Sequence, residues 1–214
     1  MTQRAKHLRA KHLPSDERRT EAVEAVIELA ASTNPEDITT SAIAARMKLT
    51  HGALFRHFQT RDAILQGVME WVSDRLLARI DRLAGAEADP VLALEAMFLG
   101  HVDFVAEHPG VPRMMVGQLQ RAGETAAKQV ARALVENYAT RLRRILSAAC
   151  AEGVLRSDLD VEAAATLFLG MVQGLVMQRL IHGDSARMRA DAPRVFAIYR
   201  AGLLAGSSEV GGRV

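Results

Sequence analysis

Apolar residues recur at spacings of three and four through most of the 214 residues, which is the period of one face of an α-helix. The first such stripe contains Val23, Val26, Ile27 and Ala30. The longest lies within residues 60–84 and contains Ile64, Leu65, Val68, Trp71, Val72, Leu76 and Ile80. No segment shows the strict alternation of a half-buried strand. The pattern therefore predicts an all-α fold of about nine helices.

Capping residues and helix-breaking residues indicate where these helices begin and end. Ser15 is placed to cap the first helix, and Asn34-Pro35 to close it, with Asn34 in the left-handed conformation. Three short helices followed by a long one are predicted between residues 15 and 84. The caps expected there and further along the chain are Thr39 or Thr40, Thr50, Thr60 and Asp160, and Gly153 is expected to end a helix in the left-handed conformation. Further helices are predicted over residues 90–107, 111–120, 124–151, 161–182 and 190–205.

Residues 39–58 have the pattern of a helix-turn-helix, in which the second helix presents its outer face to a major groove. Small Ala44 and Ala45 allow the two helices to approach, and Leu54 and Phe58 anchor the second helix from below. The residues left on or near its exposed side are Thr50, His51, Gly52, Ala53, Phe55, Arg56 and His57. Gly52 costs about 1 kcal/mol of helix propensity relative to alanine, which is reasonable where a backbone approaches a phosphate.

Basic residues are concentrated in two acid-free segments near the N-terminus. The formal net charge of the chain is only +2, but residues 1–13 and 38–61 contain no Asp or Glu. The first segment carries Arg4, Lys6, Arg9 and Lys11, and the second carries Arg46, Lys48, Arg56 and Arg61. This distribution favours a surface directed at a polyanion, the alternative being solvated charges spaced by chance. The N-terminal arm would then lie along phosphates or enter a minor groove, unless it is simply a solvated tail.

Several other classes of protein lack support in the sequence. The single cysteine, Cys150, excludes an internal disulfide and reads as a small buried hydrophobe. His101, Asp103 and His108 lack the spacing of a helical metal site, so no metal and no cofactor are expected. There is no phosphate loop or nucleophile elbow, no signal peptide, and no apolar run close to the ~20 residues of a membrane span. We expect a cytoplasmic protein that is not an enzyme.

The ordered string of motifs from Arg19 to Leu65 resembles the TetR family of bacterial transcriptional regulators. Its strongest part is Leu49-Thr50-His51-Gly52-Ala53-Leu54-Phe55-Arg56-His57-Phe58, followed by Thr60-Arg61-Asp62, and the likeness extends to about residue 75. The resemblance implies DNA-backbone contacts for Thr40, Thr50, Phe55, His57 and Arg61, and base contacts for His51, Gly52 and Ala53; Lys48 and Arg56 complete the candidate surface. Phe55 departs from the usual tyrosine and lacks its hydroxyl, so core packing is the alternative role.

The resemblance also implies a domain organisation. It consists of a basic flexible arm (1–14), a helix-turn-helix domain (15–62), a helical ligand-binding and dimerisation domain (63–206) and a flexible tail (207–214). Nine methionines suit an adaptable hydrophobic pocket, although they fill ordinary cores equally well. The candidate ligand-binding residues are Met69, Trp71, Phe98, Arg113, Met114, Gln118, Met171, Gln173 and Met177. Gly170, Gly174 and Phe196 are candidates for a two-fold helical dimer interface, the alternative being packing within one chain.

These observations predict a homodimeric transcriptional repressor that is released from a palindromic operator in double-stranded DNA by a small hydrophobic ligand. A DNA-binding protein that has no small ligand, or that is regulated by another protein, is the alternative. A helical-bundle enzyme is a third, remote hypothesis, and the sequence contains no recognisable set of catalytic residues to support it.

Overall fold

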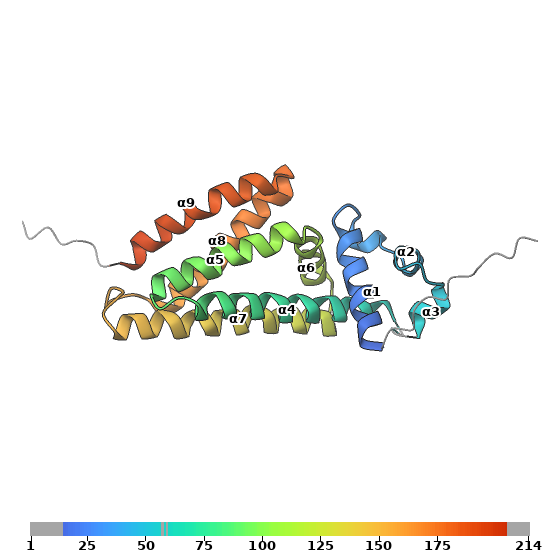
Figure 1. The fold of residues 1–214 in the computed structure, drawn as a ribbon, viewed down its shortest axis with the longest axis horizontal. Coiled ribbons are helices and arrows are strands. Elements are labelled where there is room, and N and C mark those ends of the chain that lie inside the picture. The colour runs from blue at the N-terminus through green and yellow to red at the C-terminus, as the bar shows by residue number, and fades with distance from the viewer. Residues whose placement is uncertain (1–14, 57, 59, 205–214) are drawn as a thin grey trace, which may run out of the picture.

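The computed structural model describes residues 15–56, 58 and 60–204, which form helices and connecting turns with no strand among them (Figure 1). We call α1 (Ser15–Ala30), the 3₁₀ turn η1 (Pro35–Asp37), α2 (Thr40–Arg46) and α3 (His51–Phe55) the head. The body consists of α4 (Arg61–Gly85), α5 (Pro90–Glu107), α6 (Gly110–Gln120), α7 (Ala126–Ala151), α8 (Val161–His182) and α9 (Ser185–Leu203). The expected all-α fold is confirmed, whereas the arm (1–14) and the tail (207–214) lie outside the described residues.

Side-chain caps begin most of these helices. The hydroxyl oxygens of Thr39, Thr50 and Thr60 accept backbone hydrogen bonds of 3.1, 3.3 and 3.1 Å from the third residue beyond each. Asp160 accepts one of 3.0 Å from Ala163 and begins α8 as expected. Asp184 caps α9 in the same way, so this helix begins at Ser185 and not near residue 190. The preceding Gly183, at φ +74°, provides the sharp reversal that makes the earlier start possible.

The turn after α1 differs from the sequence expectation. Ser15 is the first residue inside α1, and the helix ends at Ala30, four residues before Asn34. Asn34 is extended (φ −62°, ψ 137°) because it precedes Pro35, which begins η1. The expected left-handed asparagine is therefore wrong. The left-handed conformation occurs instead at Lys48 (φ 57°), and Gly153 adopts it as expected (φ +74°).

A continuous core joins the head to the body. Phe58 is buried where α1, α3 and α4 meet, and a Cβ on Gly67 would lie 3.3 Å from its ring, so a glycine there allows the close approach. In the body, five aromatic rings pack with centroid separations of 5.5–6.0 Å and fill the space among α5, α7, α8 and α9; they belong to Phe98, Tyr138, Phe168, Phe196 and Tyr199. The apolar stripes expected on α1 and α4 are buried, with Trp71 only partly so.

Helix α8 contradicts the expectation that no segment is long and apolar enough to cross a membrane. Its 22 residues include an 18-residue window with a mean hydropathy of 1.4, because its charged residues, Glu162 and Arg179, lie near its two ends. Length and composition alone are weak evidence for a span, since core helices of folded domains have the same properties. In this chain α8 packs against α5, α7 and α9.

Candidate nucleic-acid interface

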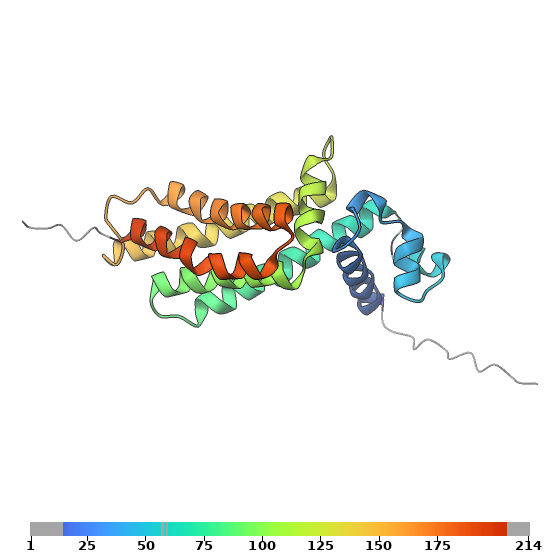
Figure 2. The same cartoon turned by 90° about the horizontal axis from the view of Figure 1, so that it is seen from above.

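Helices α2 and α3 lie at one end of the elongated molecule, with the turns α4–α5 and α7–α8 at the opposite end (Figure 1, Figure 2). The turn between α2 and α3 is a Schellman motif. The N–H of Leu49 donates to the carbonyl of Ala44 (2.8 Å), and the N–H of Lys48 donates to that of Ala45 (3.0 Å). Lys48 occupies the left-handed position that is usually glycine, so a cation is held at the corner of the motif at some cost in strain.

The outer side of this end is polar and exposed. Thr50, His51, Gly52 and Arg56 are exposed, and Thr40 is half-buried. The Oγ1 of Thr40 lies 2.9 Å from Nε2 of His51, a hydrogen bond that links the start of α2 to the start of α3. The outward orientation inferred from the sequence for these residues is therefore what the structure has.

Helix α3 is shorter than the two turns expected. It spans the five residues His51–Phe55 and ends at the C-cap Arg56. Ala53 is half-buried in it. The side chain of Phe55, and the whole of His57, lie outside the described residues, so their expected backbone contacts stay predictions.

Two of the four arginines and lysines in the acid-free segment have partners within the head. Arg46 forms an ion pair with Glu28 of α1. The Nη2 of Arg61 donates to the carbonyl oxygens of Pro35 (2.7 Å) and Glu36 (3.0 Å), so this arginine fastens η1 to the start of α4. No local sequence pattern indicates this structural role, and the phosphate contact expected of Arg61 stays a prediction.

Lys48 and Arg56 differ from these two. Both are exposed, and neither has a hydrogen-bond or ion-pair partner among the residues that the structure describes. An unpaired cation gives up no protein contact when it binds a phosphate, so these two residues are the cations of the segment best placed for DNA.

Helix α6 connects the head to the body through contacts that sequence reasoning missed. At Gly110 a Cβ would lie 2.1 Å from the carbonyl oxygen of Ile27, so only glycine allows α6 to approach α1 this closely. Just beyond the other end of α6, Arg121 forms a 2.9 Å ion pair with Asp62 in the first turn of α4. A long-range pairing of this kind has no local signature in a sequence.

The candidate ligand residues do not converge on one chamber. Met69, Phe98, Met114 and Gln118 are at most 3% exposed and belong to the packed interior. Trp71, Arg113 and Met171 are half-buried, while Gln173 and Met177 are exposed on α8. Of these residues, Phe98 belongs to the aromatic cluster of the body. A cavity of about 760 Å³ lies elsewhere, between α4, α5 and α7, and includes none of these residues.

The candidate dimerisation residues do not all lie on one exposed surface. Gly170 and Gly174 lie exposed on α8, with open space where a Cβ would be. Phe196 is 0% exposed and packs against Phe98 within the same chain, so it is unavailable to a partner and the intramolecular alternative is correct for it. Exposed apolar side chains occur nearby on α8 and α9: Leu167 (56% exposed), Met177 (48%), Ile181 (64%) and Ile198 (77%).

The all-α fold, the exposed helix-turn-helix at one end and the helical body together define a DNA-binding transcriptional regulator that is not an enzyme. Residues 23–68 match the family model described as bacterial regulatory proteins of the tetR family, and residues 120–192 match a tetracyclin repressor-like C-terminal domain. The chain belongs to the TetR family.

Relatives and solved structures agree with this assignment. The chain is similar to the nucleoid occlusion factor SlmA of Marinomonas sp. (strain MWYL1), with 25% identity over 162 residues, covering 75% of this chain and 82% of the relative. SlmA of Photobacterium profundum is 28% identical over 162 residues, covering 73% and 81%. The fold is similar to FadR from Bacillus halodurans (TM-score 0.76, 16% identity, 95% and 100% covered) and to FadR from Bacillus subtilis in complex with stearoyl-CoA (0.75, 18%, 86% and 98%).

Proposed function

We propose that this chain is a homodimeric, sequence-specific repressor that binds a palindromic operator through α2 and α3. The observation that carries the proposal is the exposed edge formed by Lys48, Thr50, His51 and Arg56 at the end of a helix-turn-helix. In the proposed complex Lys48 and Arg56 bind phosphates, and His51 with the open surface at Gly52 faces base edges. A dimer would present two such edges about one helical turn of DNA apart, ~34–36 Å.

The proposed dimer forms through the outer surfaces of α8 and α9. Only 28% of the apolar window of α8 is buried within the chain, and Ile198 on α9 is 77% exposed. Contiguous apolar surface of this kind is costly in water and marks an interaction surface. Gly170 and Gly174 would allow the helices of two protomers to approach closely, because no side chain separates the backbones there.

We further propose that a small ligand releases the repressor from DNA. One protein of similar fold, FadR of Bacillus subtilis, was solved with stearoyl-CoA bound. In this chain the contacts of α6 with α1 and α4 would carry a change in the body to the head. Release requires that the ligand bind the DNA-incompetent state more tightly than the DNA-bound state.

A second candidate is a DNA-binding protein that needs no small ligand. Two observations favour it: the aromatic rings fill the centre of the body, and the curated relatives above are named nucleoid occlusion factors. Mapping the bound sites across the chromosome separates the candidates. A repressor occupies one or a few operators, whereas a nucleoid-associated protein occupies many sites.

The DNA interface is tested by measuring affinity for a selected operator by fluorescence anisotropy over a range of salt concentrations. Arg56→Gln should weaken binding and lower the salt slope by about one, as loss of one phosphate contact does. Arg82→Gln removes the same charge from an exposed site on α4 in the body and is the matched control. Equal salt slopes for the two variants would contradict the proposed interface.

The same assay tests the dimer. Ile198→Glu places a charge on the exposed apolar face without disturbing the buried core, so the variant should fold, sediment as a monomer and bind the palindrome much more weakly. An Ile198→Glu protein that remains dimeric would show that protomers meet through another surface.

A further inference from the structure

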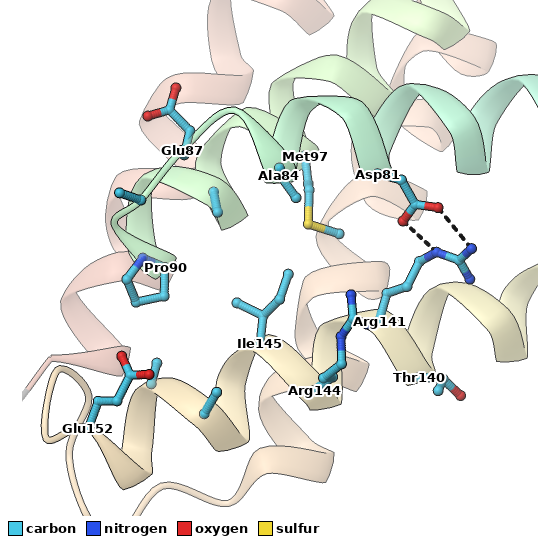
Figure 3. A pocket seen from close by; sticks show the side chains of 15 residues that line it. Asp81, Ala84, Glu87, Pro90, Met97, Thr140, Arg141, Arg144, Ile145 and Glu152 are labelled. Atoms are coloured by element: carbon cyan, nitrogen blue, oxygen red, sulfur yellow. Dashed lines mark hydrogen bonds and ion pairs between the residues drawn. The ribbon is translucent and has the colours of Figure 1, made fainter.

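The cavity of about 760 Å³ lies at the end of the body opposite α3, between the last turns of α4, the first turns of α5 and the second half of α7 (Figure 3). Its volume is in the range of small-molecule pockets. Its central lining is apolar and is provided by Ala84, Ala93, Met97, Ile145 and Ala149. Figure 3 shows Ile145 pointing from α7 into this space.

Charged side chains stand at the two ends of this apolar lining. At one end Arg141 and Asp81 neutralise each other through hydrogen bonds of 2.7 and 2.9 Å. Arg144 lies beside them, and its side chain has no hydrogen-bond or ion-pair partner among the described residues. Its positive charge is therefore the one that is not neutralised at this end.

Two exposed residues, Glu87 and Glu152, line the opposite end, and neither side chain has a partner among the described residues; in Figure 3 the carboxylate of Glu87 points away from the cavity, so Glu152 is the carboxylate available at this end. Arg144 and Glu152 are eight residues apart on α7, which corresponds to about 12 Å along the helix axis. The cavity therefore separates an unpaired cation from an unpaired carboxylate by a short apolar surface.

We propose that this cavity binds a zwitterionic amphipathic molecule, with its carboxylate on Arg144, its ammonium group near Glu152, and a short apolar chain on Ile145 and Met97. A purely anionic ligand would leave Glu152 unpaired and bring its own charge near it. A purely cationic ligand would leave Arg144 unpaired over the apolar chain. Only a molecule with both charges pairs the two ends at once.

This site is the candidate effector site of the proposed repressor, and to that extent the inference rests on the proposed function. Binding is therefore measured first without DNA, by isothermal titration calorimetry of the full chain. The probes are aminooctanoate, octanoate and octylamine, which share one chain length and differ only in their charged ends. Aminooctanoate should bind about two- to fivefold more tightly than either of the others, the gain expected from one exposed ion pair.

Substitutions of Arg144 and Glu152 test which residue binds each charged end of the ligand. Arg144→Gln should abolish the advantage of aminooctanoate over octylamine and leave octylamine binding unchanged. Glu152→Gln should abolish the advantage of aminooctanoate over octanoate and leave octanoate binding unchanged. Arg82→Gln, which lies outside the cavity lining, should leave all three affinities unchanged.

Equal affinities for the three probes, absence of binding, or an equal loss for all probes in Arg144→Gln would overturn the proposal. Operator affinity with saturating aminooctanoate is then measured separately. Charge-dependent binding that leaves operator affinity unchanged supports the site and contradicts only the release mechanism, so the two failures are distinguishable.

Discussion

The head and the body are stabilised in different ways. Helices α2 and α3 of the head are short, and each begins at a threonine whose hydroxyl caps it. The long helices of the body include side-chain caps of their own, but they also meet around packed aromatic rings, including the edge-to-face contact of Phe98 with Phe168 at 5.5 Å. Caps are local and each contributes about 1 kcal/mol, whereas burial of an aromatic ring contributes several times more. The geometry of the head therefore depends strongly on local chain chemistry and on its attachment to the body.

The largest effect of a mutation on stability is expected at the contact between α1 of the head and α6 of the body. Gly110→Ala would place a Cβ 2.1 Å from the backbone carbonyl of Ile27, which cannot move unless α1 moves. We expect a loss of about 3 kcal/mol in the free energy of unfolding, at the upper end for overpacking, and weaker operator binding as the head is displaced. Urea denaturation and anisotropy measure the two effects.

Gly100→Ala is the matched control inside the body. Its Cβ would also lie 2.1 Å from a neighbour, but that neighbour is the side chain of Leu83, which can change rotamer. The gain of about 1 kcal/mol in helix propensity offsets part of the strain, so the net change should be small. If both alanine variants lost the same stability, the distinction between a rigid junction and an adaptable interior would be wrong.

A smaller effect is expected from the buried histidine of the body. The ring of His101 stacks on Tyr138 with centroids 5.4 Å apart, and its Nδ1 has no partner among the described residues. Burial lowers the pKa of His101 to about 4. Between pH 6.5 and 4 the unfolded chain therefore binds the additional proton, and the free energy of unfolding falls as the pH falls, by about 1.4 kcal/mol per pH unit.

The variant His101→Phe retains the stacked ring and removes the titration. Other groups lose stability in acid in both proteins, so the difference between their pH profiles isolates His101. The difference in the free energy of unfolding between the two proteins should change by about 2 kcal/mol between pH 6.5 and pH 5. Parallel profiles from chemical denaturation would show that the ring is hydrated in the folded protein.

The smallest effect concerns the strained corner of the helix-turn-helix. Lys48→Gly should stabilise the chain by about 0.5–1 kcal/mol, because glycine adopts φ 57° without the Cβ clash. Lys48→Gln removes the same charge but keeps the Cβ, so it should leave stability nearly unchanged. Both variants should lose operator affinity equally if the cation at this corner binds a phosphate. Thermal unfolding without operator measures the effect of backbone strain on stability, and thermal unfolding with operator measures the effect of the lost charge on DNA binding.

Much of the head could be predicted from the sequence because its signals are local. The threonine caps, the buried faces of α1 and α2 and the exposed His51 follow from spacing and residue type. The prediction failed at the turn after α1, where Pro35 forces Asn34 into an extended conformation, and it missed the left-handed Lys48 in the separate turn after α2. The contacts of Arg61 with η1 could not be predicted, because its partners lie 25 and 26 residues away in the chain, and its expected phosphate contact stays a prediction.

The sequence by itself determined the all-α fold and the place of the helix-turn-helix, since both follow from short-range periodicity and capping, and the ordered motif string from Arg19 to Leu65 indicated the family. The tertiary structure alone decided which buried residues fill the body and which line a cavity. Phe98 and Phe196 were candidates for different surfaces, yet they pack against each other, while Arg144 and Glu152 stand at opposite ends of a cavity. Helical periodicity indicates which face of a helix is buried, but not which neighbouring helix packs against that face. The side chains of both helices together determine whether the space between the two helices is filled or forms a cavity.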